Sequence, residues 1–235
     1  MKNIAVILAS GTGERTGLNI PKQFVKIAGK TVFEHAIETF EKHPLIDEII
    51  IVSHMDYIDF VKAIAIKNNY KKIVTVLAGG STRRDSSYIG ISSINDEDAK
   101  VIIHDAARPF LRAEIIDECV GALENYDAVD VAIRTSDTLI IVDENNIIKE
   151  IPDRKIYRRS QTPQAFKLKT IKNAHKLANL EPNLDVTDDC GLIVHYKLCD
   201  IFVIEGDEFN RKITYQVDLA IADTLFKIKN NEYSF

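Results

Sequence analysis

The 235-residue sequence predicts an α/β protein with a doubly wound, mostly parallel sheet. Short apolar runs, such as residues 4–8 and 46–52, alternate along the chain with longer stretches in which apolar residues recur at helical spacing. The short runs are rich in isoleucine and valine and do not alternate with polar residues, which is typical of strands covered on both faces. A glycine-containing turn follows the first run directly. Together these features indicate strand-helix units joined by right-handed crossovers.

A continuous apolar run predicts each strand, and apolar residues at helical spacing predict each helix. In residues 31–43, for example, Phe33, Ile37 and Phe40 fall on one helical face. The predicted strands are residues 4–8, 46–52, 74–78, 101–105, 129–133 and 201–205. The predicted helices are residues 31–43, 58–67, 83–94, 115–126, 168–180 and 218–229, with another after Thr187. We expect ligands to bind at the carboxyl ends of the strands, as in other open α/β sheets.

The alternation lapses at residues 138–152, where two apolar runs flank the turn sequence Asp-Glu-Asn-Asn. This is the signal of a β-hairpin. We predict one domain spanning residues 1–235, with residues 137–160 forming an inserted β-arm. The apolar faces of the arm need a cover, and two alternatives stay open: a second copy of the chain, or the chain's own domain.

Composition excludes several classes of function. A net charge of -5 gives no general attraction to nucleic acid or to an anionic membrane surface, and no apolar run is long enough to span a bilayer. The cysteines Cys119, Cys190 and Cys199 are odd in number and lack the spacing of metal ligands. We therefore expect a cytoplasmic protein in a reducing compartment.

The first candidate site is the turn after the first strand. Gly11 and Gly13 let backbone N–H groups converge on an anion, and the cations Arg15 and Lys22 follow closely. This arrangement suits a triphosphate. The dinucleotide fingerprint is disfavoured because Thr16 stands at its third glycine, and a phosphate loop ending in Gly-Lys is absent. The alternative is a tight turn without a ligand.

Two further clusters lie at predicted strand ends. Asp105 ends a strand, where a carboxylate can hold Mg²⁺ against phosphate oxygens, and Arg108 follows it. Residues 78–87 carry a glycine pair that permits close approach to a flat base, then Arg83 at a helix start. The alternatives are a helix cap at Asp105 paired with Arg108, and an N-cap at residue 81 or 82 with solvated arginines.

Isolated groups come later in the chain. Arg154 and Lys212 are the cations expected to bind a substrate phosphate. Thr187 is expected to hydrogen-bond sugar-like hydroxyls. The alternative for each residue, taken alone, is a solvated surface position. His35 and His104 have no serine or cysteine partner in a catalytic pattern. We interpret both as satisfied structural histidines.

Taken together, these segments resemble the cytidylyltransferases of the group that contains the methylerythritol-phosphate enzyme of isoprenoid synthesis and the ribitol-5-phosphate enzyme of cell-wall and capsule synthesis. The resemblance covers nearly the whole chain and implies a Rossmann-like nucleotidyltransferase fold. Its motifs, in order, are Gly-x-Gly-x-Arg with Pro21-Lys22-Gln23, Gly79-Gly80 with Arg83 and Ser86, His104-Asp105-Ala106-Ala107-Arg108-Pro109, Gln161-Thr162-Pro163-Gln164, Thr187-Asp188-Asp189 and Asn210-x-Lys212-x-Thr214.

The resemblance also implies roles. Arg15, Lys22 and Lys212 would act on the CTP phosphates, and Asp105 would bind Mg²⁺. Arg108, Arg154, Thr187, Asp105 and Lys212 would handle a polyol phosphate, with Arg154 reaching across a homodimer. The nucleotide would meet Leu8, Ala9, Ser10, Gly11, Thr12, Gly13, Gly79, Gly80, Arg83, Ser86 and Asp105.

The acceptor is the least determined part of this hypothesis. Residues 109–111, 151–154, 164–169 and 187–191 look more like the ribitol-phosphate group, some of whose members also carry a reductase, whereas Ala107 favours methylerythritol phosphate. Ser10 and Thr82 depart from the usual family residues in the nucleotide site. We favour D-ribitol 5-phosphate, with methylerythritol phosphate as the alternative, and a silent CTP-binding regulator or scaffold for a reductase as the alternative of another class.

Overall fold

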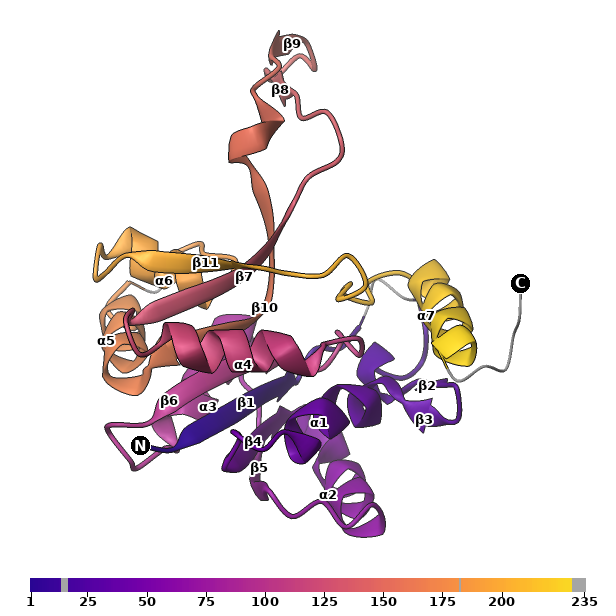
Figure 1. Ribbon diagram of the computed structural model, residues 1–235. Coiled ribbons are helices and arrows are strands. Elements are labelled where there is room, and N and C mark those ends of the chain that lie inside the picture. The colour runs from indigo at the N-terminus through magenta and orange to yellow at the C-terminus, as the bar shows by residue number, and fades with distance from the viewer. Residues whose placement is uncertain (14–16, 182, 230–235) are drawn as a thin grey trace.

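The computed structural model describes residues 1–13, 17–181 and 183–229, which form a seven-stranded sheet flanked by helices (Figure 1). The order across the sheet is β11-β7-β10-β6-β1-β4-β5. All pairs of neighbours are parallel except the two that involve β10, so the predicted mostly parallel sheet is confirmed. The strands are β1 (Asn3–Ala9), β4 (Glu48–Ser53), β5 (Ile73–Ala78), β6 (Lys100–Asp105), β7 (Ala128–Arg134), β10 (Arg158–Lys167) and β11 (Ile201–Glu205).

Strand β10 is the main element that the sequence analysis missed. It lies antiparallel between β6 and β7, near the centre of the sheet. Its first half, residues 158–162, is polar, and Pro163 follows directly, which removes a backbone donor and is atypical of a central strand. The sheet accommodates this stretch with a register shift between Ser160 and Gln164. The hairpin of β2 (Lys26–Ile27) and β3 (Lys30–Thr31) was also not predicted.

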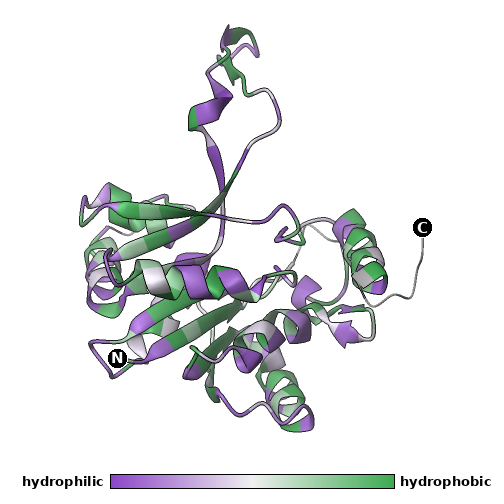
Figure 2. Cartoon of the chain, in the orientation of Figure 1, coloured by the Kyte–Doolittle hydropathy of each residue, from purple (hydrophilic) through white to green (hydrophobic). Residues whose placement is uncertain are grey.

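Alternate residues of the strands supply two hydrophobic cores. Along β1, Ala5 and Ile7 face a core built with α1 (Val32–Lys42), α2 (Ile58–Lys67) and α4 (Ala113–Ala122). Ile4 and Val6 face a second core built with α3 (Arg83–Ser92), α5 (Leu168–Ala178) and α6 (Asp189–His195). Figure 2 shows hydrophobic residues concentrated along the central strands. Burial on both faces explains why these strands are continuous apolar runs in the sequence.

The helices match the predicted ones to within a few residues. Among those described, none combines the length and apolar character that crossing a bilayer requires. Capping boxes begin two of them: Thr31 with Glu34 at α1, and Thr82 with Asp85 at α3. The helices are α1 (Val32–Lys42), α2 (Ile58–Lys67), α3 (Arg83–Ser92), α4 (Ala113–Ala122), α5 (Leu168–Ala178), α6 (Asp189–His195) and α7 (Gln216–Lys229).

Helix α7 fixes the last site segment of the chain. Its Leu219, Ala222 and Phe226 form a third cluster with Ile213 and with residues of the β2–β3 region. The backbone N–H of Ile213 also donates to the Ala107 carbonyl over 2.9 Å. Lys212 is therefore held beside the loop that follows β6.

The predicted hairpin is present as β8 (Ile141–Val142) and β9 (Ile148–Glu150). It stands away from the sheet between β7 and β10 and does not fold back onto its own domain (Figure 1). Its aliphatic side chains are left in solvent, with Ile141 45%, Ile148 53% and Ile151 63% exposed. We call residues 137–160 the arm.

Candidate active site

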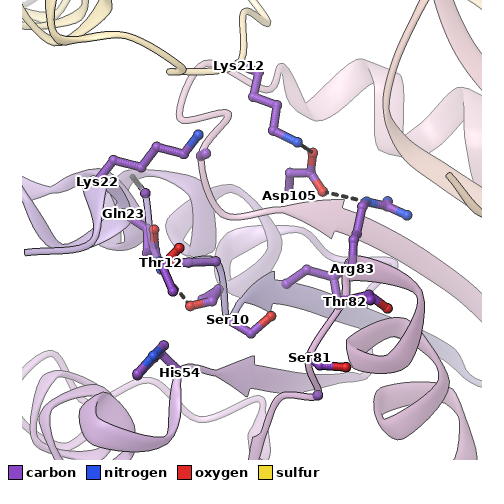
Figure 3. Close-up of a pocket in the computed structure, with 16 residues that line it drawn as sticks. Ser10, Thr12, Lys22, Gln23, His54, Ser81, Thr82, Arg83, Asp105 and Lys212 are labelled. Atoms are coloured by element: carbon purple, nitrogen blue, oxygen red, sulfur yellow. Dashed lines mark hydrogen bonds and ion pairs between the residues drawn. The ribbon is translucent and has the colours of Figure 1, made fainter. Parts of the chain in front are cut away.

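A cavity of about 680 Å³ opens at the carboxyl ends of β1, β4, β5 and β6, where the fold predicted a ligand (Figure 3). Of the predicted site residues, it gathers Leu8, Ala9, Ser10, Gly11, Thr12, Gly13, Lys22, Gly80, Arg83, Asp105 and Lys212. Gly79 and Ser86 lie directly behind its wall, against Ser10. Arg15 lies outside the described residues. The first candidate loop, the glycine pair and Asp105 therefore share one site.

The loop after β1 is shaped by contacts that need glycine and glutamine. Gly13 has a φ of +77°, and a Cβ there would lie 2.9 Å from the backbone nitrogen of Lys22. Only glycine fits this position without strain. The amide of Gln23 donates to the carbonyls of Ala9 over 2.7 Å and Gly11 over 2.8 Å. Gln23 thus holds the loop in place through these two hydrogen bonds. The motif Pro21-Lys22-Gln23 included this residue, but the sequence did not indicate its role.

Asp105 sits at the centre of a charged cluster. Its Oδ2 contacts Lys212 Nζ at 2.7 Å, and its Oδ1 contacts Arg83 Nε at 3.3 Å (Figure 3). Burial by itself would raise the pKa of Asp105, but Arg83, Lys212 and Arg108 hold that pKa well below its usual range. The carboxylate is therefore ionised at any physiological pH. Two cations converge on it before any ligand binds.

Arg83 is anchored from behind by a second carboxylate. Its Nη1 contacts Asp189 Oδ2 at 2.7 Å, and Asp189 also accepts hydrogen bonds from Ser87 Oγ at 2.6 Å and His175 Nε2 at 2.9 Å. Asp189, Ser87 and His175 are all buried. Sequence reasoning predicted Arg83 beside the nucleotide but missed its ion pair with Asp189. Arg83 bridges two carboxylates from different elements.

Of the residues expected to hold the acceptor, Asp105 and Lys212 line this cavity, whereas Arg108, Arg154 and Thr187 do not. Arg108 Nη1 donates to the Asn210 carbonyl over 2.8 Å, so the suggested pairing of Arg108 with Asp105 on the surface is not found. Thr187 is exposed and borders a separate small recess behind Arg83. Arg154 lies in the arm, where its Nη1 donates to the Ser136 carbonyl over 2.6 Å.

The two histidines set aside from catalysis have structural partners. His104 is buried between the Thr162 hydroxyl, 3.1 Å from Nδ1, and the Arg108 carbonyl, 3.1 Å from Nε2. Burial lowers the pKa of His104 to about 4, so the ring is neutral. His35 Nε2 lies 2.9 Å from the Ile27 carbonyl. His54, in contrast, lines the cavity and was not predicted there.

The donor set can accommodate a magnesium ion only together with phosphates. No group of three or more His, Cys, Asp or Glu side chains suited to a metal occurs in the part of the chain that the structure describes. Mg²⁺ commonly takes one or two carboxylates and completes its shell with water and substrate phosphate oxygens. Asp105, facing the cavity, is a carboxylate of that kind.

Comparison with known proteins identifies the family of this chain. The family model described as 2-C-methyl-D-erythritol 4-phosphate cytidylyltransferase matches residues 3–228. The chain belongs to this family of cytidylyltransferases. It is therefore a nucleotidyltransferase, and the resemblance noted from the motifs is confirmed.

Relatives of this cytidylyltransferase carry two kinds of name. A bifunctional ribulose 5-phosphate reductase/CDP-ribitol pyrophosphorylase of Haemophilus influenzae is 44% identical over 235 residues, covering 98% of this chain and 49% of the relative. The chain thus spans about half the length of that relative. A 2-C-methyl-D-erythritol 4-phosphate cytidylyltransferase of Clostridium tetani is 38% identical, covering 98% of this chain and 92% of the relative. The crystal structure of 4-diphosphocytidyl-2C-methyl-D-erythritol synthase from Anaerococcus prevotii superposes with a TM-score of 0.87 at 30% identity, covering 96% of both chains.

Proposed function

We propose that the enzyme transfers CMP from CTP to D-ribitol 5-phosphate, giving CDP-ribitol and pyrophosphate. A phosphate oxygen of the acceptor attacks the α-phosphorus in line with the leaving pyrophosphate, and no covalent enzyme intermediate forms. The observation that carries the proposal is the facing of the glycine loop and the Lys212–Asp105–Arg83 cluster across one cavity. Such a site catalyses by positioning reactants and neutralising charge.

The donor half of the reaction is assigned to this cavity. Backbone N–H groups of residues 10–13, with Arg15 and Lys22, hold the β- and γ-phosphates, and Lys212 approaches the α-phosphate. Lys212 starts 2.7 Å from Asp105, so incoming phosphates compete with that carboxylate for the same ammonium group. The glycine pair 79–80 and Arg83 surround the base and ribose, and Ser86 supports that wall from behind through Ser10 and Gly80.

Mg²⁺ fits as the cofactor, held by Asp105 together with the phosphates of CTP. When bound, the ion withdraws negative charge from the phosphate oxygens. Arg83 keeps the Asp105 carboxylate oriented toward the cavity, and Asp189 keeps Arg83 in place. Lys212 and Lys22, which both line the cavity, carry positive charge to the transition state.

The acceptor half is assigned to Arg108 and Thr187 of one chain and to Arg154 of a second copy. Arg154 lies in the arm and does not line the cavity of its own chain. The exposed aliphatic side chains of the arm suit a homodimer in which each arm lies against the other protomer. A dimer of this kind completes each cavity with a cation that its own chain does not place there.

Ribitol 5-phosphate is the preferred acceptor because of the Haemophilus influenzae relative, whose name includes CDP-ribitol pyrophosphorylase, and because of the motifs at residues 109–111 and 187–191. The reductase half of that relative's name also suggests a reductase as the source of the acceptor. Methylerythritol phosphate is the second candidate, supported by the family model and by the Clostridium tetani relative.

A pyrophosphate-release assay with CTP, Mg²⁺ and a panel of polyol phosphates tests the proposal, with Lys212→Ala as the catalytically impaired control. We expect turnover with ribitol 5-phosphate and much weaker turnover with methylerythritol phosphate. The reverse order would exchange the two acceptors. Turnover with no member of the panel, despite CTP binding, would favour the regulator or scaffold.

A further inference from the structure

The hydroxyl of Ser10 can hydrogen-bond in only one direction. Ser10 stands where the family resemblance leads one to expect alanine or glycine in the loop. Ser10 lines the cavity beside the loop glycines, and its Oγ lies 2.8 Å from Ser86 Oγ. Either oxygen can donate in a contact of this length. Which one does so decides what Ser10 offers to a ligand.

The neighbours of Ser86 settle the direction of this hydrogen bond. Ser86 Oγ lies 2.9 Å from the Thr82 carbonyl and receives the Gly80 N–H over 3.2 Å. A hydroxyl has one proton and two lone pairs, and a carbonyl oxygen only accepts. Ser86 therefore spends its proton on Thr82, and its lone pairs accept from Gly80 and from Ser10. Since Ser86 is fully buried, no solvent competes for these positions.

Ser10 must then donate to Ser86, which leaves only lone pairs of its Oγ toward the cavity. The opposite orientation would place the oxygens of Ser86 and Thr82 2.9 Å apart with no proton between them. Ser10 is thus an acceptor that cannot reverse its role without breaking the Ser86–Thr82 hydrogen bond.

The position of Ser10 indicates which part of a nucleotide meets it. In Figure 3, Ser10 lies toward Ser81 and away from Lys212, so it is remote from the cation that draws the phosphates. The wall at Ser10 is also tightly packed, since a Cβ on Gly79 would lie 2.3 Å from Ser10 Cβ. A bare backbone wall suits the flat face of a base.

We infer that Ser10 selects cytosine over uracil by accepting a hydrogen bond from the exocyclic 4-amino group of the base. Uracil carries a carbonyl oxygen at that position, which would face the Ser10 lone pairs without a proton. This inference rests on the proposed use of CTP and adds the residue that distinguishes it from UTP. A mismatch of this kind costs about 10- to 100-fold in kcat/KM.

The test measures kcat/KM of the full chain for CTP, UTP and the triphosphate of pyrimidin-2-one riboside, which lacks the 4-amino group. The wild type should prefer CTP over both other nucleotides by about 10- to 100-fold in kcat/KM. Ser10→Ala should lose most of this preference, chiefly by slowing CTP. Ser86→Ala should also weaken it although Ser10 is still present, because the Ser10 proton becomes free to turn toward a uracil oxygen. A purely structural role for either serine would not change the ratio between nucleotides.

Ser81→Ala is the matched control, since Ser81 also lines the cavity and spends its proton, over 2.7 Å, on Asp85. It should keep the wild-type ratio. An unchanged ratio in Ser10→Ala, a loss of preference in Ser81→Ala alone, or a change confined to CTP against dCTP would overturn the inference. If wild type does not turn CTP over at all, the proposed function fails, and the same nucleotide ratios are then measured by calorimetric binding.

Discussion

The cavity and the arm are built in opposite ways. Around the cavity, charged groups are paired before a ligand arrives: Asp105 is 6% exposed between Lys212 and Arg83, and Asp189, 1% exposed, anchors Arg83 from behind. In the arm, aliphatic side chains are in solvent, and the ion pair of Lys149 with Asp143 lies at the surface. One region is preorganised around buried charges, and the other leaves its aliphatic side chains exposed.

This difference separates the two halves of the proposed reaction. Preorganised charges in a buried site stabilise a transition state without having to reorganise, which suits the triphosphate end. An isolated two-stranded hairpin is marginally stable in water, so the arm is expected to gain its stability from a partner. We therefore expect changes in the cavity to affect chemistry and changes in the arm to affect assembly.

The largest expected effect follows from removing a cation at the cavity. Lys212→Ala removes the ammonium group 2.7 Å from Asp105 and should lower kcat/KM by about 100-fold or more, as with the loss of one preorganised donor elsewhere. Pyrophosphate release measures it. The variant should sediment as wild type does, because Lys212 lies next to residues of α7 and outside the arm. A loss below about threefold would contradict its assigned role.

The next effect concerns assembly. The double substitution Ile141→Asp and Ile148→Asp places charge on the exposed aliphatic surface of the arm and should weaken self-association by about 100-fold. Sedimentation velocity over a concentration series measures this. Nucleotide binding, assigned to the cavity of one chain, should be retained. Unchanged association would show that the arm does not form the dimer.

A smaller effect is expected within β7, at Asp130. Burial, together with the nearby Asp188, raises the pKa of Asp130 to about 6, although Gln164 and Ser160 donate to it. The folded chain therefore binds this proton more tightly than the unfolded chain, and the Asp130 contribution to stability falls as pH rises from about 4 to about 6. Asp130→Asn should remove that slope and raise the free energy of unfolding at pH 7 by on the order of 1 kcal/mol.

Urea unfolding at several pH values measures this change. Asp59→Asn, at an exposed carboxylate of α2, is the control and should leave the slope as in wild type. A stability of Asp130→Asn that declines with pH as steeply as that of wild type would contradict the account of Asp130.

The smallest effect is expected at the surface of the arm. Lys149→Ala removes the exposed ion pair with Asp143, and exposed pairs of this kind contribute little. Thermal unfolding and pyrophosphate release should both match wild type. A clear loss of activity would mean that Lys149, rather than Arg154, is the cation supplied by the arm.

The sequence predicted the parts of this molecule that depend on local pattern. Continuous apolar runs predicted the parallel strands, because both faces of the sheet are buried. The spacing of the glycines predicted the loop at residues 10–13. Strand β10 was missed because its polar residues and Pro163 resemble a loop, and only its place between β6 and β7 makes it a strand.

Contacts between distant segments were beyond sequence reasoning. Arg83 and Asp189 are 106 positions apart, and nothing in either local pattern indicates that they meet. The direction of the Ser10–Ser86 hydrogen bond also depends on the Thr82 carbonyl, whose place is visible only in the folded chain. Arg154 was predicted from its motif, but a single chain does not bring it to the cavity.

Mixing two inactive variants tests most directly the claim that the cavity serves its own chain and the arm serves its neighbour. Arg154→Ala and Lys212→Ala are each expected to be impaired as homodimers, measured by pyrophosphate release with CTP and ribitol 5-phosphate. After dissociation and reassembly at equal amounts, half of the dimers are mixed, and each mixed dimer has one site with both cations. We predict recovery to about a quarter of the wild-type rate. If the mixture stays as inactive as its components, while native mass spectrometry shows that mixed dimers form, Arg154 does not act across the dimer and the account is contradicted.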